Sequence, residues 1–254
     1  MEREIKKINH HGREVFGYLY LPEGKGIFPI VIFSHGYNGS GDDFAEYAAY
    51  LTERGVAAFC YDFCGGSVRS RSSMKTTEMT IFTEKEDLCA VVTAIRQEPR
   101  IDADKVFLFG GSQGGLVSAL TADELEDQVR GLILLFPALC IADDWNKRFP
   151  EASEIPEKVN FWGMELGRVF FESIQGFATF EHVGHYAKSV LVMHGDRDEV
   201  VPVEYSERIS RQYPQARLEI FEGEGHGFSE MGSMRAAQLT AEFVEENVAC
   251  NRCV

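Results

Sequence analysis

Short apolar runs alternate with longer amphipathic segments along most of the chain. The apolar runs end in small or polar residues, as buried strands do, and predict strands over residues 30–34, 56–61, 105–109, 131–136, 190–194 and 218–221. The intervening segments place apolar side chains three and four positions apart and predict helices over residues 43–54, 84–97, 114–124, 203–213 and 234–248. Such an alternation requires right-handed crossovers, so we expect an α/β fold with a mostly parallel, doubly wound sheet.

Two segments depart from this alternation. Residues 14–21, which end before Pro22, alternate polar and apolar side chains, a pattern typical of an antiparallel edge strand. Residues 138–188 contain no strand-like apolar run and are interrupted by Pro150 and Pro156. Because open α/β sheets bind ligands at the carboxyl ends of their strands, we expect this insertion to lie over that edge as a cap or lid. Its aromatic side chains either contact a ligand or simply pack the cap onto the body, and they include Trp145, Phe149, Phe161, Trp162, Phe170, Phe171, Phe177 and Phe180.

Composition and charge narrow the functional classes. With 254 residues, of which 44% are hydrophobic, the chain can bury one large core, and we expect a single domain over residues 1–254. Its 40 acidic and 25 basic residues give a net charge of -15, which opposes binding to nucleic acids or anionic membranes. No signal-peptide core follows Met1, and no stretch is long and apolar enough to span a bilayer.

The cysteines bear on the cellular compartment. Several of them lie inside apolar runs, which is typical of reduced, buried thiols, so we expect a cytoplasmic protein. Cys250 and Cys253 form a CxxC pair, but no second pair or nearby histidine accompanies them, and we expect a frayed tail there. The sequence contains no metal site, nucleotide loop or cofactor motif, so we expect no cofactor. The oligomeric state stays open, with a homodimer as one alternative.

Gly110-Gly111-Ser112-Gln113-Gly114 fits the pattern G-x-S-x-G between a predicted strand and a predicted helix. This context is that of a nucleophile elbow, a sharp turn that exposes the serine hydroxyl. The turn brings neighbouring backbone close on both sides, so glycines are needed two residues before and two residues after the serine. We therefore expect Ser112 to be a catalytic nucleophile at the N-terminus of a helix, where developing negative charge is favoured.

A nucleophilic serine needs a base, and the base needs a carboxylate that fixes its tautomer. His226 is the candidate base, because it lies in the glycine-flanked loop Gly223–Phe228 that follows the last predicted strand. In a strand-to-helix elbow fold the acid lies between the serine and the histidine in sequence. The loop after the strand 190–194 supplies candidate carboxylates, including Asp196 and Asp198.

The tetrahedral intermediate also needs two N–H donors. One is the backbone amide of Gln113, directly after the nucleophile. The other comes from the loop after the strand 30–34, where the pattern His35-Gly36 assigns the role to the amide of Tyr37. His35 and His194 are expected to organise their loops rather than to act as a second base.

Taken together, His35-Gly36, Tyr61-Asp62-Phe63, Gly110–Gly115, the 194–202 loop and Gly225-His226 resemble the bacterial cinnamoyl (feruloyl) esterases of the α/β-hydrolase superfamily. The resemblance implies an α/β-hydrolase fold with a cap, about residues 138–188, inserted after the sixth strand. It also implies that Asp198 is the acid, with Asp196 as the alternative.

The same resemblance suggests how a substrate is bound. Asp144 stands where relatives use an aspartate to bind the hydroxyl of an aromatic ring, and Trp145 or Trp162 could flank that ring. Alternatively, Asp144 is a solvated or helix-capping residue. One motif departs from the family, because Cys64-Gly65-Gly66-Ser67 replaces the usual Arg-Gly-His-Gly after Tyr61-Asp62-Phe63, which leaves the shape of that loop open.

These residues predict a serine esterase that hydrolyses carboxylic esters through an acyl-enzyme. The resemblance implies that the acyl group is a hydroxycinnamoyl group or another small acyl group. Three alternatives remain open. A serine peptidase or aminopeptidase would need a group in the cap for a charged peptide terminus, for which Glu165, Glu172 and Glu181 are candidates. An acyltransferase would pass the acyl group to an alcohol, and a non-catalytic binding module would retain only the fold.

Overall fold

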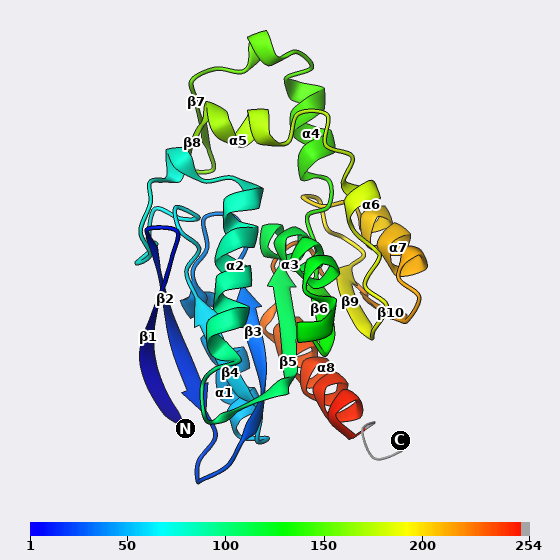
Figure 1. The fold of residues 1–254 in the computed structure, drawn as a ribbon. Helices are drawn as coiled ribbons and strands as arrows, with labels where there is room; N and C mark the ends of the chain where they lie inside the picture. The colour runs from blue at the N-terminus through cyan, green and yellow to red at the C-terminus, as the bar shows by residue number, and fades with distance from the viewer. Residues whose placement is uncertain (250–254) are drawn as a thin grey trace.

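The computed structural model describes residues 1–249, so Cys250 and Cys253 lie outside the described residues. One eight-stranded sheet forms the centre of the molecule, with the order β1-β2-β4-β3-β5-β6-β9-β10 (Figure 1). β1 and β2 are antiparallel to their neighbours, and the strands from β4 to β10 run parallel, which confirms the predicted sheet. The strands are β1 (Glu2–His10), β2 (Arg13–Leu21), β3 (Phe28–Ser34), β4 (Ala57–Tyr61), β5 (Ile101–Gly111), β6 (Gly131–Leu135), β9 (Val190–Gly195) and β10 (Ala216–Phe221).

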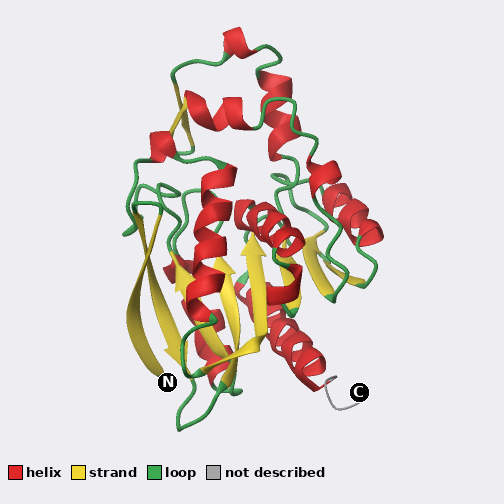
Figure 2. Ribbon diagram, viewed as in Figure 1, coloured by secondary structure: helices red, strands yellow, loops and turns green. Residues whose placement is uncertain are grey.

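Helices cover both faces of the sheet, as a doubly wound fold requires (Figure 2). On one face α2 (Ile81–Ile95), α3 (Gln113–Glu124) and α7 (Val203–Gln212) pack in one hydrophobic cluster. On the other face α1 (Ala45–Thr52) and α8 (Glu230–Ala249) pack in a second cluster. In β5 the side chains alternate between them, because Val106 and Leu108 point to the first cluster and Phe107 and Phe109 to the second. Burial on both faces explains why the central strands are continuous apolar runs.

The structure corrects the expectations for the first strands. β1 was not expected, because Glu2–His10 is mostly charged and only its alternation of exposed and half-buried positions marks it as a strand. It pairs with β2 over its whole length, so β2 is antiparallel as predicted but lies inside the sheet rather than at its edge. Charged side chains on the outermost strand protect its unpaired backbone from association with other strands.

The segment between β6 and β9 lies above the carboxyl ends of the parallel strands, at the top of Figure 1. It contains α4 (Ile141–Arg148), α5 (Arg168–Ser173), α6 (Thr179–His182) and a hairpin of β7 (Lys158–Phe161) and β8 (Met164–Gly167). The hairpin corrects the expectation that this segment holds no strand. Its turn, Trp162 and Gly163, has φ values of 43° and 79°, as a two-residue type I′ turn demands. The hairpin packs onto the body, where Thr76 Oγ1 donates to the Glu165 carbonyl at 2.7 Å.

No helix among residues 1–249 combines the length and the apolar character needed to cross a bilayer.

Candidate active site

Ser112 stands in the turn between β5 and α3. Its backbone has φ 51° and ψ -119°, a conformation that non-glycine residues rarely adopt and that costs about 1–3 kcal/mol. The turn is tightly enclosed, because a Cβ at Gly110 would lie 2.2 Å from the Gly114 carbonyl oxygen, and a Cβ at Gly114 would lie 2.3 Å from the Ser34 carbonyl oxygen. The two glycines therefore permit the turn that exposes the serine hydroxyl.

Three side chains that are distant in the sequence are linked by two consecutive hydrogen bonds. Ser112 Oγ lies 3.0 Å from His226 Nε2, and His226 Nδ1 lies 2.8 Å from Asp198 Oδ2. His226 follows β10 and Asp198 follows β9, so parallel strands bring all three to one edge of the sheet. Asp196, the alternative acid, instead accepts a hydrogen bond from the amide of Gly223.

Asp198 is held as a carboxylate. Its side chain is fully buried, and burial alone would raise its pKa, but hydrogen bonds from His194, His226 and the Val201 amide outweigh burial and hold the pKa well below its usual range. Oδ1 accepts from the amides of Val200 and Val201, each at 2.8 Å. These two bonds leave Oδ2 directed at the histidine ring.

The two backbone amides predicted to bind the oxyanion belong to residues that line the cavity beside Ser112. The amides of Tyr37 and Gln113 donate to no backbone acceptor within residues 1–249. Gln113 is the first residue of α3, and the first N–H groups of a helix have no partner within the helix. A Cβ at Gly36 would lie 3.1 Å from Ser112 Cβ, which shows how closely the loop after β3 approaches the nucleophile. His35 supports this loop, since its Nδ1 donates to the Gly36 carbonyl at 2.7 Å and its Nε2 accepts from the Phe63 amide at 3.0 Å.

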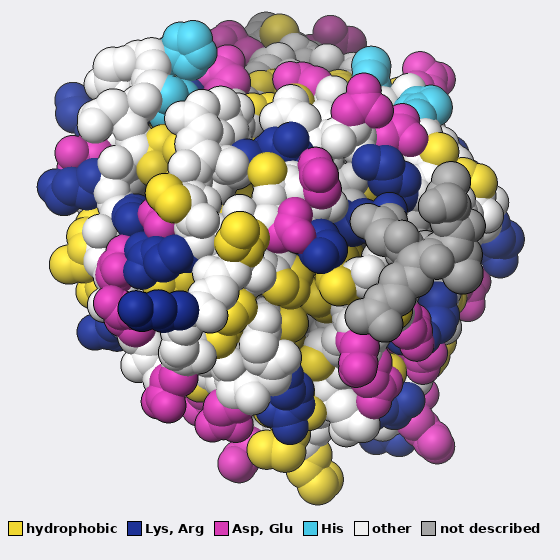
Figure 3. All heavy atoms as spheres, turned by 60° about the horizontal axis from the view of Figure 1, so that its bottom comes forward, with side chains coloured by type: hydrophobic (Ala, Val, Ile, Leu, Met, Phe, Trp, Pro, Cys, Tyr) yellow, Lys and Arg dark blue, Asp and Glu magenta, His cyan; other side chains and the backbone are white. Residues whose placement is uncertain are grey.

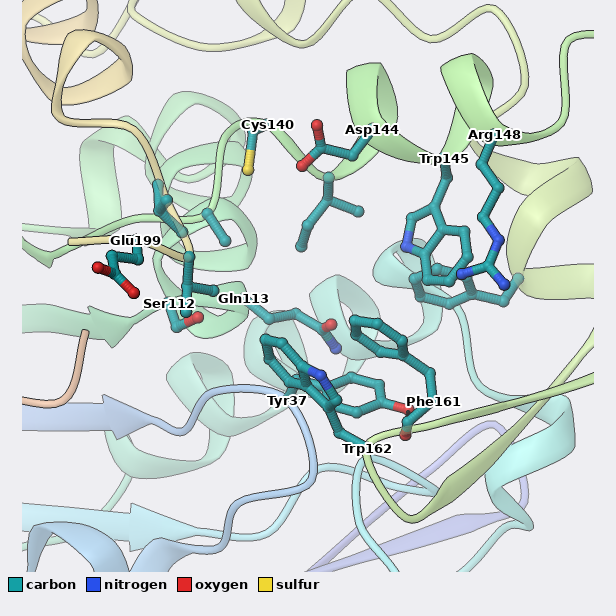
Figure 4. A pocket seen from close by; sticks show the side chains of 15 residues that line it. Tyr37, Ser112, Gln113, Cys140, Asp144, Trp145, Arg148, Phe161, Trp162 and Glu199 are labelled. Carbon is teal, nitrogen blue, oxygen red and sulfur yellow. Dashed lines mark hydrogen bonds between the residues drawn. The ribbon is translucent and has the colours of Figure 1, made fainter. Parts of the chain in front are cut away.

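A cavity of about 310 Å³ opens beside Ser112 and extends under the segment between β6 and β9. Figure 4 shows Ser112 at one end and Trp145 and Arg148 of α4 at the other. The predicted residues Asp144, Trp145 and Trp162 all line it. The remaining lining residues named in Figure 4 are Tyr37, Gln113, Cys140, Phe161 and Glu199.

A second cavity of about 440 Å³ also reaches Ser112. It is lined by His226, by Phe44 and Tyr47, and by Phe136 and Phe228 among others. Ser112, Tyr37 and Trp162 line both cavities, so the nucleophile stands between them. Sequence reasoning did not predict this second cavity, because the aromatic residues that line it come from segments that are far apart in the chain and carry no recognisable motif.

Tyr37 also joins the body to the hairpin. Its hydroxyl donates to the carbonyls of Phe161 at 2.8 Å and Met164 at 3.3 Å, and Asn38 Nδ2 donates to the Trp162 carbonyl at 3.3 Å. The hairpin turn is thereby held next to the loop that carries the Tyr37 amide. Sequence reasoning considered only the backbone of Tyr37 and missed this side-chain role.

One group of potential metal ligands occurs elsewhere in the described part of the chain. Atoms of His10, Cys64 and Asp87 lie within 4.8 Å of one another. Asp87 is already engaged, since its oxygens lie 2.7 Å from His10 Nε2 and from the Cys64 amide, and 3.5 Å from Arg13 Nε. Because a guanidinium repels a metal cation, we interpret this group as a hydrogen-bonded network that joins β1 to α2.

Two family models match the chain. One, described as serine aminopeptidase, S33, matches residues 27–171, which include Ser112. The other, described as TAP-like protein, matches residues 175–248, which include Asp198 and His226.

Curated relatives are distant and longer. The chain is 27% identical to thiohydrolase aneE of Aspergillus aculeatus over 54% of its own length and 42% of that protein. It is 23% identical to the acylamino-acid-releasing enzyme of Homo sapiens over 83% of its own length and 30% of that protein. The chain thus aligns with less than half the length of either relative.

Solved structures match over nearly the whole chain. Est1E from Butyrivibrio proteoclasticus with ferulic acid bound is 27% identical, with a TM-score of 0.88, over 96% of this chain and 99% of that chain. DcsB in complex with a substrate analogue is 21% identical, with a TM-score of 0.83, over 98% of this chain and 100% of that chain, and at this identity it supports the fold alone. These matches confirm the α/β-hydrolase fold and the resemblance to feruloyl esterases.

Proposed function

The chain belongs to the S33 serine aminopeptidase family of α/β-hydrolases, and on this premise we propose that it is a serine esterase, which cleaves carboxylic esters through an acyl-enzyme. The observation that carries the proposal is the hydrogen-bonded chain from Ser112 through His226 to Asp198, with distances of 3.0 and 2.8 Å. A serine hydroxyl is a poor nucleophile at neutral pH unless a base takes its proton. His226 is placed to be that base.

In the proposed mechanism Ser112 Oγ attacks the ester carbonyl carbon while His226 Nε2 takes the hydroxyl proton. The amides of Tyr37 and Gln113 donate to the oxyanion that forms. The bond to the alcohol oxygen then breaks, and His226 returns its proton to that oxygen. A water molecule attacks the acyl-enzyme with His226 again as base, and Ser112 recovers its proton as the acid leaves. Asp198 holds the Nδ1–H and stabilises the imidazolium.

We assign the two cavities to the two halves of the ester. His226 must reach the leaving oxygen, and it lines the second cavity. The alcohol therefore belongs there, and the acyl group belongs in the first cavity beneath α4 and the β7–β8 hairpin. In that cavity the rings of Trp145, Phe161 and Trp162 suit an aromatic acyl group.

A hydroxycinnamoyl group is the acyl group that we favour. Asp144 lines the same cavity and would accept a hydrogen bond from a ring hydroxyl, as the resemblance to feruloyl esterases implies. The bound ferulic acid in the structure of Est1E, which is 27% identical to this chain, supports the same assignment.

A substrate panel tests the proposal. Methyl ferulate and p-nitrophenyl esters are expected to be hydrolysed, aminoacyl p-nitroanilides to be turned over more slowly, and Ser112→Ala to abolish both. Amide turnover faster than ester turnover would overturn the esterase assignment, and unchanged turnover by Ser112→Ala would overturn the nucleophile. Transfer of the acyl group to an added alcohol, measured by product analysis, would identify an acyltransferase.

The second candidate is an aminopeptidase, which the description of the family favours. Such an enzyme needs a carboxylate for the free amino group of its substrate. Among the residues expected for this role, Glu165 pairs with Lys158 and Glu172 with Arg168. Glu165, Glu172 and Glu181 are absent from the linings of the two cavities described within residues 1–249. Asp144 and Glu199 line the first cavity instead, and they are the carboxylates that this alternative requires.

A further inference from the structure

Glu84 is a carboxyl group in the first turn of α2 that the proposed mechanism does not use. Its side chain is fully buried. Oε2 accepts a hydrogen bond from Gln113 Nε2 at 2.8 Å, and Gln113 is the residue whose amide we assign to the oxyanion. Oε1 has no hydrogen-bond partner among residues 1–249. A buried acceptor with no partner is uncommon in folded proteins and calls for a physical reason.

Glu84 also contacts the loop that supports the second oxyanion donor. A Cβ at Gly66 would lie 2.9 Å from Glu84 Oε1 and 3.2 Å from His35 Cε1, so the carboxyl packs directly against this glycine. The Gly66 carbonyl in turn accepts the amide of Asn38 at 3.2 Å, directly after Tyr37. Ser67 Oγ donates to the Asn38 carbonyl at 3.2 Å. The loop that departs from the family pattern thus links Glu84 to the Tyr37 segment.

We propose that Glu84 is a positioning residue that fixes both amides of the oxyanion hole, through Gln113 on one side and through Gly66 and Asn38 on the other. This inference rests on the proposed serine-esterase function, because it assigns Glu84 a role in the same site. It explains why a carboxyl group is buried beside the nucleophile elbow.

The surroundings of Glu84 disfavour its charged form. Burial raises the pKa of Glu84 to about 8, and the nearby Asp87 adds to the increase, although the hydrogen bond from Gln113 acts in the opposite direction. From the neighbouring segments, His35 is kept neutral because burial lowers its pKa, and Tyr61 is kept neutral because burial raises its pKa well above the ordinary value. The His10 ring and the Arg13 guanidinium are directed at Asp87 rather than at Glu84.

The proposal predicts a loss of activity at alkaline pH. Below pH 8 the carboxyl is neutral and the oxyanion forms beside an uncharged group. Above pH 8 Glu84 ionises, and its negative charge opposes the charge that develops on the oxyanion in a poorly solvated site. The ratio kcat/KM should therefore fall as pH rises through about 8.

Glu84→Gln, Glu84→Ala and the control Glu86→Gln separate positioning from charge. Glu86 is on the same helix, and its side chain is 55% exposed.

The assay uses p-nitrophenyl acetate, and rates are corrected for spontaneous hydrolysis. Glu84→Ala should lower kcat at pH 7 by about tenfold, with little change in KM. This loss is smaller than that caused by removal of an oxyanion donor itself. Glu84→Gln keeps a neutral hydrogen-bonding group, so it should recover kcat to within about threefold of wild type and remove the alkaline decline. Glu86→Gln should keep the wild-type profile.

Two results would overturn the inference: a Glu84→Gln enzyme that keeps the wild-type decline near pH 8, or a folded Glu84→Ala enzyme with wild-type kcat. Thermal unfolding checks the fold of each variant, and if Glu84→Ala does not fold, the pH profile of Glu84→Gln decides. The rate of fluorophosphonate labelling of Ser112 reports on the oxyanion hole without an ester substrate, and it should show the same pH dependence. Wild-type enzyme that is labelled but hydrolyses no ester would refute the esterase function alone, and wild-type enzyme that does neither would refute both.

Discussion

Ser112 lies in a strained turn, and its hydroxyl can act as a nucleophile only if a base and an acid lie next to it. His226 lies at hydrogen-bond distance from the hydroxyl, and Asp198 from the other ring nitrogen. Asp198 is itself fixed by three neighbours, because Val200, Val201 and His194 all contact its oxygens. The geometry therefore favours Asp198 over Asp196 as the group that orients the base.

Substitution of the two aspartates tests this choice. Asp198→Asn is expected to lower kcat for p-nitrophenyl acetate by about 10⁴-fold, because the amide no longer holds the required histidine tautomer. Asp196→Asn is the matched control and should change kcat by less than about threefold, since Asp196 contacts Gly223 and not His226. Equal losses in both variants would contradict the assignment.

Sequence spacing could not choose between these aspartates, which stand two residues apart in one loop. The choice depends on how the backbone turns after β9, where two successive amides capture Asp198 Oδ1. Glu84 was hidden for a similar reason. The hydrophobic pattern predicted only that a helix begins at Glu84. The burial of Glu84 against Gln113 arises from the packing of α2 on α3.

Among the elements, the β7–β8 hairpin lines the acyl cavity together with α4, which contributes more of the lining side chains. The turn residue of the hairpin, Trp162, lines both cavities, and Phe161 lines the first. Its alternation over four residues in each strand is too short to be recognised in an aromatic segment. β1 could not be predicted from an apolar run, because most of its residues are charged. It forms a strand by pairing with β2 along its whole length. The central strands, by contrast, are buried on both faces and could be predicted from their apolar runs alone.

Tyr37→Phe tests the attachment of this hairpin. The change removes the hydroxyl that donates to Phe161 and Met164 but leaves the backbone amide in place. A lost hydrogen bond of about 1 kcal/mol should raise KM for methyl ferulate about fivefold, with kcat within about twofold of wild type. Tyr186→Phe, which removes a bond to the Val129 carbonyl, is the control and should leave both constants unchanged. A large fall in kcat with unchanged KM would contradict this role.

For the whole molecule, the doubly wound sheet brings loops from β3, β5, β9 and β10 to one edge, and the segment after β6 covers that edge. The face at the opposite end carries interspersed acidic and basic side chains (Figure 3). With a net charge of -15, the protein should avoid polyanions. Its cytoplasmic location and a homodimeric state stay predictions.

The expected lack of nucleic-acid binding can be measured directly. Fluorescence anisotropy with labelled duplex DNA and single-stranded RNA at low salt should show no binding at micromolar protein, because low salt gives the strongest electrostatic attraction. A saturable increase in anisotropy that disappears with added salt would reveal a basic surface and contradict the prediction.

The most direct test of the central claim is to trap the acyl group. Wild-type protein is mixed rapidly with p-nitrophenyl acetate, quenched in acid, digested and analysed by mass spectrometry. The account predicts a burst of p-nitrophenol and an acetyl group on the peptide that contains Ser112, and neither of these in Ser112→Ala. An acetyl group on another residue that forms at the rate of turnover, or undiminished turnover in Ser112→Ala, would contradict it.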